Sequence, residues 1–264
     1  MTTLVTILVA MAIVALAEAA IPLHARERRH VGANLALTFI TFATNVFFNA
    51  ALVATLARTD GFGLLRLLPV GPIAGGIVTV LLLDFSFYVA HVAMHRVPGF
   101  WRYHRVHHAD PAVDVTTTIR QHPGEGVIRY AFMAAFALGL GASPGAFAVY
   151  RVWSALNGLL EHANVRVPSR LDRALSLVTT WPNMHKVHHS RMVAQANTNY
   201  GNITSLFDRL FGTFTPSQHG ADVVYGLDGC DDPTSQTTAA LLAMPFCSAD
   251  PPAGVPAELV RSAS

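Results

Sequence analysis

Two short stretches of the chain repeat the same histidine pattern. YHRVHHAD covers residues 103–110, and MHKVHHSR covers residues 184–191. On a helix, positions i, i+3 and i+4 share one face, so each stretch presents three imidazole rings together. Such a face binds a metal ion or handles protons, whereas a basic surface helix is the simpler alternative. The six histidines are His104, His107, His108, His185, His188 and His189.

The segment DFSFYVAHVAMH, residues 84–95, carries a second set of candidate ligands. Its polar side chains Asp84, Tyr88, His91 and His95 fall at i, i+4, i+7 and i+11, which is one stripe of a helix. His91 and His95 have the i, i+4 spacing of paired metal-binding histidines. A lone histidine on an apolar stripe is more often a hydrogen-bonded core residue. Two of them shortly before a triplet predict two ligands.

Asp84 and Tyr88 need a separate explanation, because the segment before them is apolar. A carboxylate within a membrane helix costs about 3 kcal/mol unless it faces a partner. We expect Asp84 to accept an N–H from a ligating imidazole and so to orient it. Tyr88 is a further supporting candidate on the same stripe. Pairing of Asp84 with an arginine is the alternative.

Single histidines extend this set. His162, in LEHANVRVP, ends an apolar segment and is a predicted ligand. His122, in IRQHPGE, precedes a Pro–Gly turn and is a candidate ligand, although a supporting residue or a loop histidine has the same context. His24, His30 and His219 lack partners at useful spacing, and we expect them to face solvent.

The number of clustered histidines exceeds the four to six ligands of one ion, so we expect two metal ions. Ligation by nitrogen alone suits Fe, Zn, Cu or Ni and disfavours Mg or Ca. Cys230 and Cys247 have no metal-type spacing and predict neither a disulfide framework nor a cysteine site. No catalytic residue beyond the metal site is predicted.

The composition indicates a membrane protein. Hydrophobic residues make up 52% of the 264 residues and charged residues 13%, about half the charged share of a soluble domain. The net charge is +2 without a basic run, which gives no indication of a nucleic-acid partner. Apolar runs cover residues 4–23, 35–57, 72–92, 127–140 and 146–160. The last two are short and predict a helical hairpin turning at GASPG.

Basic residues orient the expected helices. Arg26, Arg28 and Arg29 follow the first run and place the first loop in the cytoplasm, although Arg58 and Arg66 then lie outside. Every clustered histidine falls at the cytoplasmic ends. A cleaved signal peptide is the alternative for the first run, but no Lys or Arg precedes it.

We therefore predict an all-α, polytopic membrane helical bundle with a cytoplasmic, histidine-rich helical cap. Its expected parts are N-terminal transmembrane helices and a loop at 1–70, a catalytic domain at 71–216 and a C-terminal tail at 217–264. The tail ends in PPAGVPAELVRSAS, which we expect to be disordered.

The order of motifs resembles the fatty acid hydroxylase/sterol desaturase superfamily over about residues 83–214. It runs His-x3-His, His-x2-His-His, a lone His, His-x2-His-His and then NYGNITSLFDRLFGTF. DFSFYVAHVAMH, RQHPGE and DRLFGTF are also similar to that family's signatures. TTTIRQ and NTNYGN are more similar to its alkylglycerol monooxygenase and bacterial desaturase-like branch.

The resemblance implies an integral membrane oxygenase with two iron ions and O2 as co-substrate. It implies hydroxylation or desaturation of a sterol, fatty acyl, carotenoid or ether lipid, with zinc able to replace iron on overexpression. Because no fused redox domain is evident, electrons are expected from a separate ferredoxin, cytochrome or reductase. The implied ligands are His91, His95, His104, His107, His108, His162, His185, His188 and His189, and His122 is a further candidate.

Other classes fit the pattern less well. A metal transporter needs polar ligands along a pathway through the membrane, and only Asp84 lies within a predicted span. A zinc membrane hydrolase would use fewer ligands and a His-Glu-x-x-His motif, which the sequence lacks. A haem anchor needs one or two axial histidines rather than three clusters.

Overall fold

The computed structural model describes residues 2–59 and 62–247, and within these ranges the chain is helical with no strand. The all-α prediction is therefore confirmed for the described residues. The long helices are α1 (Thr2–Ala20), α2 (Val31–Arg58), α3 (Pro72–Arg96), α5 (Pro123–Leu140) and α6 (Pro144–Glu161). Shorter helices are α4 (Pro98–His108), α7 (Ser169–Leu175), α8 (Pro182–His188), α9 (Val193–Ala196), α10 (Leu206–Leu210) and α11 (Thr238–Ala243). The 3-10 turns are η1 (Leu64–Leu67), η2 (Val115–Ile119), η3 (Ser217–Asp222) and η4 (Met244–Phe246).

Proline and glycine set the helix ends. Proline occupies the first turn of α3, α4, α5, α6 and α8, where its missing N–H costs no hydrogen bond. Gly141 ends α5 in the left-handed region, with φ 69°. A Cβ on Gly141 would lie 1.9 Å from the carbonyl oxygen of Phe62. Glycine at this position therefore lets the loop before η1 pack closely on the α5–α6 turn.

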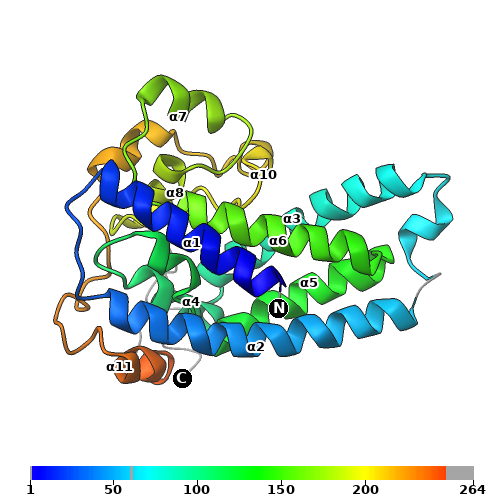
Figure 1. The fold of residues 1–264 in the computed structure, drawn as a ribbon, viewed down its shortest axis with the longest axis horizontal. Coiled ribbons are helices and arrows are strands. Elements are labelled where there is room, and N and C mark those ends of the chain that lie inside the picture. The colour runs from blue at the N-terminus through cyan, green and yellow to red at the C-terminus, as the bar shows by residue number, and fades with distance from the viewer. Residues whose placement is uncertain (1, 60–61, 248–264) are drawn as a thin grey trace.

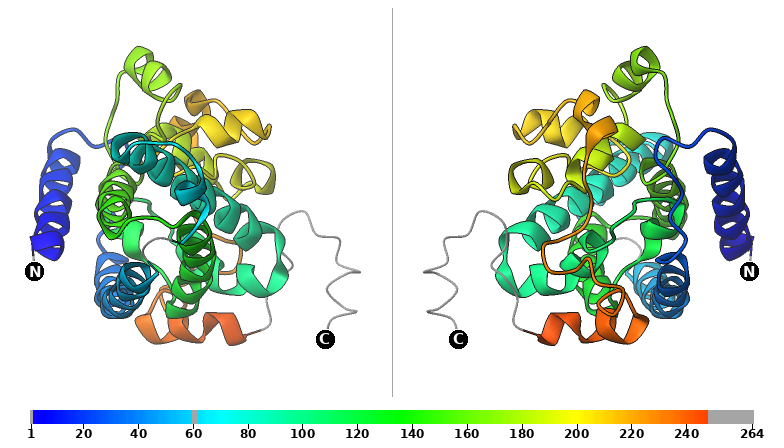
Figure 2. Two further views of the ribbon diagram at one scale, coloured as in Figure 1. Left: turned by 90° about the vertical axis from the view of Figure 1, so that its right-hand side faces the viewer. Right: turned by 90° about the vertical axis from the view of Figure 1, so that its left-hand side faces the viewer.

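Four long helices form the centre of the molecule. Viewed along their axes, α2, α3, α5 and α6 surround a common interior, while α1 stands outside and packs on α6 (Figure 2). Apolar side chains fill part of this interior, including Leu56, Leu83, Tyr130 and Phe147. Close van der Waals packing of these side chains holds the helices together.

The outer surface of these helices is apolar. α2 and α3 are long and apolar enough to cross a membrane, and α1 contains a shorter apolar segment. On α2, Phe39 and Phe47 are 63% and 68% exposed, and Ile73 on α3 is 82% exposed. Large apolar side chains this exposed suit contact with lipid rather than with water.

The loops at one end of the long helices carry the histidines. Figure 1 shows the α1–α2 loop, α4, α8 and the end of α6 at the left, and η1 and the α5–α6 turn at the right. The histidines that follow α3 and α6 therefore meet at one end of the bundle, as expected. That this end faces the cytoplasm stays a prediction.

Residues 217–247 lie against α4 and α8, which carry histidines, and against α2. η3 packs on α8, η4 on α4 and α11 on α2, and Leu241 of α11 is fully buried. This part of the expected tail thus belongs to the body of the protein. The segment 251–264 with the expected disorder lies outside the described residues.

His30 is buried rather than solvent-facing, so that expectation is wrong. Its Nδ1 lies 2.8 Å from Oδ1 of Asp110, and its Nε2 lies 3.3 Å from Oδ2 of Asp114. Asn34 Nδ2 and Thr117 Oγ1 donate to the other Asp110 oxygen, each over 2.8 Å. No local pattern indicates this site, because His30 and its two aspartate partners lie 80 or more residues apart along the chain.

Arg120 extends the same polar network. Its side chain is fully buried and donates to the carbonyl oxygen of Val106, to Asn34 Oδ1 and to Gln236 Oε1 over 2.7–2.9 Å. Since Asp110 directly follows the first triplet, the network joins that triplet to the start of α2 and to the C-terminal segment.

We expect the contribution of His30 to depend on pH. Burial opposes its charged form, but hydrogen bonds and charge from Asp110 and Asp114 outweigh this and raise the pKa of His30 from 6.5 to about 10. The stabilisation is therefore full below pH 6.5, declines above it and is lost once the pH passes about 10. His30→Gln should lower the free energy of unfolding by about 3 kcal/mol near neutral pH.

Thermal unfolding in detergent over a pH series measures this effect. His219→Gln, which changes an exposed histidine, is the control and should leave the melting temperature unchanged. A His30→Gln deficit of equal size at neutral and strongly alkaline pH would contradict a role for the charged ring.

Candidate metal centre

The structure gathers nine of the ten histidines proposed as ligands into two adjacent groups, and none of the nine is more than 4% exposed. Within each group the candidate ligand atoms all lie within 4.8 Å of one another. The five-histidine group consists of His91, His95, His104, His108 and His188. The four-histidine group consists of His107, His162, His185 and His189.

Each triplet contributes to both groups. In the first, His104 and His108 join the five-histidine group and His107 the other; in the second, His188 joins the five-histidine group and His185 and His189 the other. Successive residues of a helix are turned by about 100°, so the i+3 ring leans away from the i and i+4 rings. The repeated motif therefore lets two short helices, α4 and α8, connect both groups. The first triplet gives two rings to the five-histidine group and one to the four-histidine group, and the second triplet gives one and two.

Hydrogen bonds determine which ring nitrogen faces the group. His162 donates from Nδ1 to the carbonyl oxygen of Gly158 over 2.8 Å, so its Nε2 carries a lone pair. That Nε2 lies 3.1–3.2 Å from the Nε2 atoms of His107, His185 and His189. Metal–nitrogen bonds of about 2.0–2.1 Å place adjacent ligand atoms about this far apart. The four nitrogens thus fit around one ion.

One loop, residues 197–200, orients three rings of the five-histidine group. His95 Nδ1 lies 3.3 Å from Oδ1 of Asn197, and His188 and His91 donate from Nδ1 to the carbonyl oxygens of Thr198 and Tyr200, both over 2.8 Å. His188 Nε2 then has no hydrogen-bond partner among the described residues. Such a buried, unsatisfied lone pair is costly unless a metal ion or a proton donor meets it.

The loop itself is strongly anchored. Asn199 adopts a left-handed backbone, φ 56°, which asparagine tolerates better than most residues. Its side chain donates to the carbonyl oxygens of Met184 and Thr215 and accepts from the Thr215 N–H. These contacts hold the loop's carbonyl oxygens toward the imidazoles.

Asp84 acts on this loop and does not contact an imidazole, in contrast to the expected hydrogen bond. Its two oxygens accept the backbone N–H groups of Ile203 and Thr204 over 3.0 and 3.1 Å. Asp208 accepts the N–H groups of Tyr200 and Gly201, both over 2.8 Å. A carboxylate on each side therefore fixes the segment whose Tyr200 carbonyl orients His91.

Tyr88 also lies beside this segment. The Tyr88 hydroxyl group is 3.0 Å from Thr213 Oγ1. The Thr213 hydroxyl group in turn donates to Asp208 Oδ1. Asp208 was missed from the sequence, although it stands in DRLFGTF. An acidic residue within this family-like motif was the sequence feature that could have indicated Asp208.

Two further carboxylates lie beside the histidines. Glu125 Oε1 is 3.3 Å from His104 Nδ1, and Glu161 Oε1 is 3.8 Å from both His162 Nδ1 and His185 Nε2. Both are at most 3% exposed. Sequence reasoning missed them because neither has a distinctive spacing, although each lies within three residues of a singled-out histidine.

His122 lies outside both groups. Its Nδ1 accepts the N–H of Gly124 over 2.9 Å, and its Nε2 is 3.3 Å from the carbonyl oxygen of Leu242. Both nitrogens thus serve the start of α5 and the C-terminal segment, so this geometry does not support the prediction that His122 is a ligand. His24 is half-buried and His219 is exposed, both away from the groups.

Burial keeps the clustered rings uncharged. Desolvation, joined for most rings by neighbouring positive charge, lowers the pKa of His104, His107, His108, His185 and His189 well below 6.5. Desolvation likewise lowers the pKa of His162 to about 4 and of His188 to about 3. At neutral pH the rings are thus available as neutral nitrogen donors.

Comparison with known proteins agrees with this site. The profile of the fatty acid hydroxylase family matches residues 76–213, which is more than half of the chain and contains both groups. The chain belongs to the fatty acid hydroxylase family. The resemblance to this superfamily, predicted from the motifs, is thereby confirmed.

Several curated relatives share about 30% identity with this family member. The ornithine lipid hydroxylase of Rhizobium tropici is 30% identical over 170 residues, 64% of this chain and 50% of the relative. The alkylglycerol monooxygenase of Caenorhabditis elegans is 30% identical over 148 residues, 54% and 28% of the two chains. A very-long-chain aldehyde decarbonylase of Oryza sativa subsp. indica is 30% identical over 179 residues, 64% and 26%. These matches span half or less of each relative, and no solved structure matches significantly.

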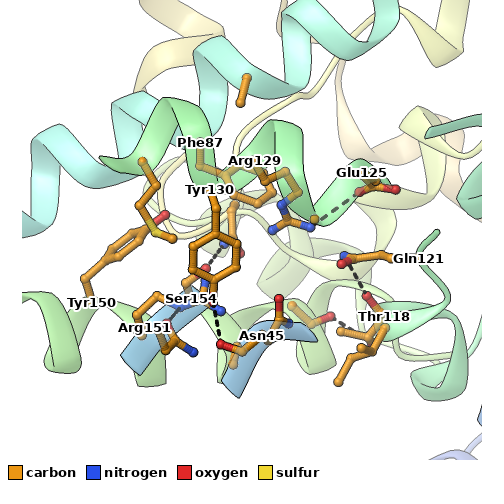
Figure 3. A pocket seen from close by; sticks show the side chains of 18 of the residues that line it. Asn45, Phe87, Thr118, Gln121, Glu125, Arg129, Tyr130, Tyr150, Arg151 and Ser154 are labelled. Carbon is orange, nitrogen blue, oxygen red and sulfur yellow. Dashed lines mark hydrogen bonds and ion pairs between the residues drawn. The ribbon is translucent and has the colours of Figure 1, made fainter. Parts of the chain in front are cut away.

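In this family member a cavity leads to the histidines. It has a volume of about 420 Å³ and lies among α1, α2, α3, α5 and α6. Apolar side chains such as Phe42, Met133 and Phe147 line it, and His91, His104, His107, His162 and His185 line it as well. Figure 3 shows polar side chains on its wall, among them Arg129, Arg151 and Glu125.

We expect Asp84→Asn to weaken metal binding without emptying the site. Asparagine keeps one acceptor but turns an NH2 group toward a backbone N–H, so the loop behind His91 loosens. Residues that orient ligands typically matter about 10–100-fold in metal affinity. Asp84→Leu, which removes both acceptors, should be worse.

Competition with a chelator, together with a membrane-insertion assay, measures this. Asp222→Asn, a change at an exposed carboxylate, is the matched control and should bind metal like the wild type. Wild-type affinity in Asp84→Asn would leave Asp84 a purely structural residue. A completely empty site would contradict a role limited to orienting the ligands.

Proposed function

We propose that this chain is a di-iron, O2-dependent membrane oxygenase that hydroxylates an unactivated C–H bond of a lipid. The observation that carries the proposal is the convergence of two groups of neutral, lone-pair-bearing imidazoles at the end of a largely apolar cavity. Two adjacent groups favour two ions, and nitrogen ligands suit iron.

The protein residues have separable tasks in this proposal. The two histidine groups would hold iron ions, which with O2 and electrons supply the oxidant for C–H cleavage. The loop 197–200 and Gly158 keep the ligating nitrogens aimed inward. Apolar side chains such as Met133 and Phe147 seat the lipid chain and exclude water.

The relatives support a lipid as substrate and hydroxylation as outcome. Their names specify an ornithine lipid hydroxylase and an alkylglycerol monooxygenase. A desaturation would start from the same C–H cleavage and lose a second hydrogen. We therefore place hydroxylation of a polar membrane lipid before desaturation, and before a sterol or carotenoid substrate.

The proposal includes a multi-pass arrangement with the site at the cytoplasmic face. Arg26, Arg28 and Arg29 are exposed in the α1–α2 loop, at the same end of the bundle as the histidines (Figure 1). Positive charge in such a loop favours the cytoplasmic side. A soluble ferredoxin, cytochrome or reductase would reach the site from there.

A zinc-dependent membrane hydrolase is the second candidate. Glu161 favours it, because a buried carboxylate 3.8 Å from His185 Nε2 is placed like the acid–base group of a metal hydrolase. A transporter is less favoured, since the candidate ligands gather at one end of the helices rather than along a path between them.

Purified protein should contain about two metal ions per chain, because each histidine group has enough nitrogens for one. Elemental analysis after aerobic expression with added iron measures this. His162→Ala should remove about one ion, since its Nε2 meets three other ring nitrogens. Wild-type protein with one ion or fewer would contradict the two-metal arrangement, whereas zinc in place of iron would not.

Cells that express the chain should contain an oxygenated lipid whose new oxygen atom comes from O2. Mass spectrometry of lipids from cells grown under isotopically labelled O2 tests both atom source and product. His108→Ala and His189→Ala should abolish the product, while His24→Ala and His219→Ala retain most of it. Hydrolysed lipid without O2-derived oxygen would favour the hydrolase, and equal damage from both pairs would refute the ligand assignment.

A further inference from the structure

Two arginines line the cavity from neighbouring helices. Arg129 belongs to α5 and Arg151 to α6, and both lie beside Tyr130 (Figure 3). The Arg129 guanidinium is 4.5 Å from the ring centre of Phe87, and the Arg151 guanidinium is 5.3 Å from that of Tyr130. Stacking on aromatic rings fixes a guanidinium without using its N–H donors.

These guanidinium groups have few acceptors in the protein. Arg129 Nη1 lies 3.6 Å from Oε1 of Glu125, and Arg151 Nε donates to Oδ1 of Asn49 over 3.2 Å. Within the part of the chain that the structure describes, no carboxylate lies within 4.0 Å of Arg151. The Tyr130 hydroxyl is a further partner of Arg151. Each guanidinium has five N–H donors, so several remain available to an acceptor in the cavity.

The two arginines place positive charge among the membrane helices. A charged side chain among membrane helices is costly, and it is retained where it faces a partner or a functional pathway. Glu125 only partly offsets the pair, because its oxygen near Arg129 is also 3.3 Å from His104 Nδ1. The wall beside Tyr130 therefore presents positive charge to an otherwise largely apolar cavity.

The arginines lie close enough to the two histidine groups for one lipid molecule to contact both. Arg129 follows Glu125 by one helical turn. Arg151 precedes His162 by 11 residues on α6, which is roughly 16 Å along a helix. A chain-like molecule held at the arginines can therefore extend toward the histidines inside the same cavity.

We propose that Arg129 and Arg151 bind an acidic group, a carboxylate or a phosphate, on the lipid substrate. The inference rests on the proposed function and narrows it to anionic lipids. Guanidinium groups bind carboxylates and phosphates through paired N–H donors, whereas an alcohol accepts fewer and uncharged hydrogen bonds. Sterols and carotenoids without an acidic group lack the feature that these arginines recognise.

Equilibrium binding to purified, iron-loaded protein in a nonionic detergent tests the proposal without turnover. Radiolabelled palmitic acid, hexadecyl phosphate and hexadecanol share one chain and differ in the polar group. At least one of the two anionic probes should bind about 10–100-fold more tightly than hexadecanol. The tighter of the two identifies carboxylate or phosphate as the recognised group.

Arg151→Gln is the decisive variant, because Arg151 touches neither a candidate ligand nor Glu125. It should bring the affinity for the anionic probe down to that for hexadecanol and leave hexadecanol binding and metal content unchanged. Arg151→Lys keeps the charge but loses the paired donors, so its affinity for the anionic probe should fall between those of the wild type and Arg151→Gln. The lysine variant carries the test if the glutamine variant does not fold. Arg170→Gln, at an exposed position on α7, should match the wild type.

The outcomes separate this inference from the proposed function. Equal binding of all three probes, or an unchanged preference in both Arg151 variants, would overturn anion recognition while a lipid oxygenase still stands. Selective anion binding that Arg151→Gln removes would support it, even if labelled O2 showed the protein to be a hydrolase. Failure of all three lipids to bind would also overturn anion recognition, while the experiment with labelled O2 still decides the proposed function.

Discussion

The site depends on one constraint: nine buried imidazoles must stay uncharged and turn their lone pairs toward one another. A neutral ring whose Nδ1–H finds an acceptor outside the group keeps its Nε2 free for a metal ion. The carbonyl oxygens of Gly158, Thr198 and Tyr200 supply such acceptors. Loop backbone at these positions is therefore as important as the histidines themselves.

The remaining polar residues serve to hold these acceptors and the short helices in place. Asp84 and Asp208 fix the segment around Tyr200 from α3 and α10. On the opposite side, Asp110 with His30 joins the end of α4 to the start of α2. Each of these carboxylates receives several hydrogen bonds, so the charge is kept at the periphery of the histidine groups rather than within them.

The helices place this polar centre at the end of a largely apolar cavity. The histidines lie in the last turns of α3 and beyond the ends of α3 and α6, while the apolar lengths of the same helices enclose the cavity. Glu125 and Glu161 lie where cavity and histidines meet. A polar centre and an apolar cavity thus meet within one bundle, and the arginines beside Tyr130 add positive charge to the cavity wall.

The sequence by itself determined the helical class, the apolar segments and nine histidines that converge, because helical periodicity and motif spacing are local properties of the chain. Only the tertiary structure decided which ring of each triplet enters which group, since that depends on how α4 and α8 cross. It also decided that Asp84 holds backbone N–H groups near position 203, that His30 is buried with Asp110, and that His122 caps α5. The partners of Asp84 and His30 are about 80 to 120 residues distant along the chain, and a hydrogen bond over such a separation leaves no periodic signal in the sequence.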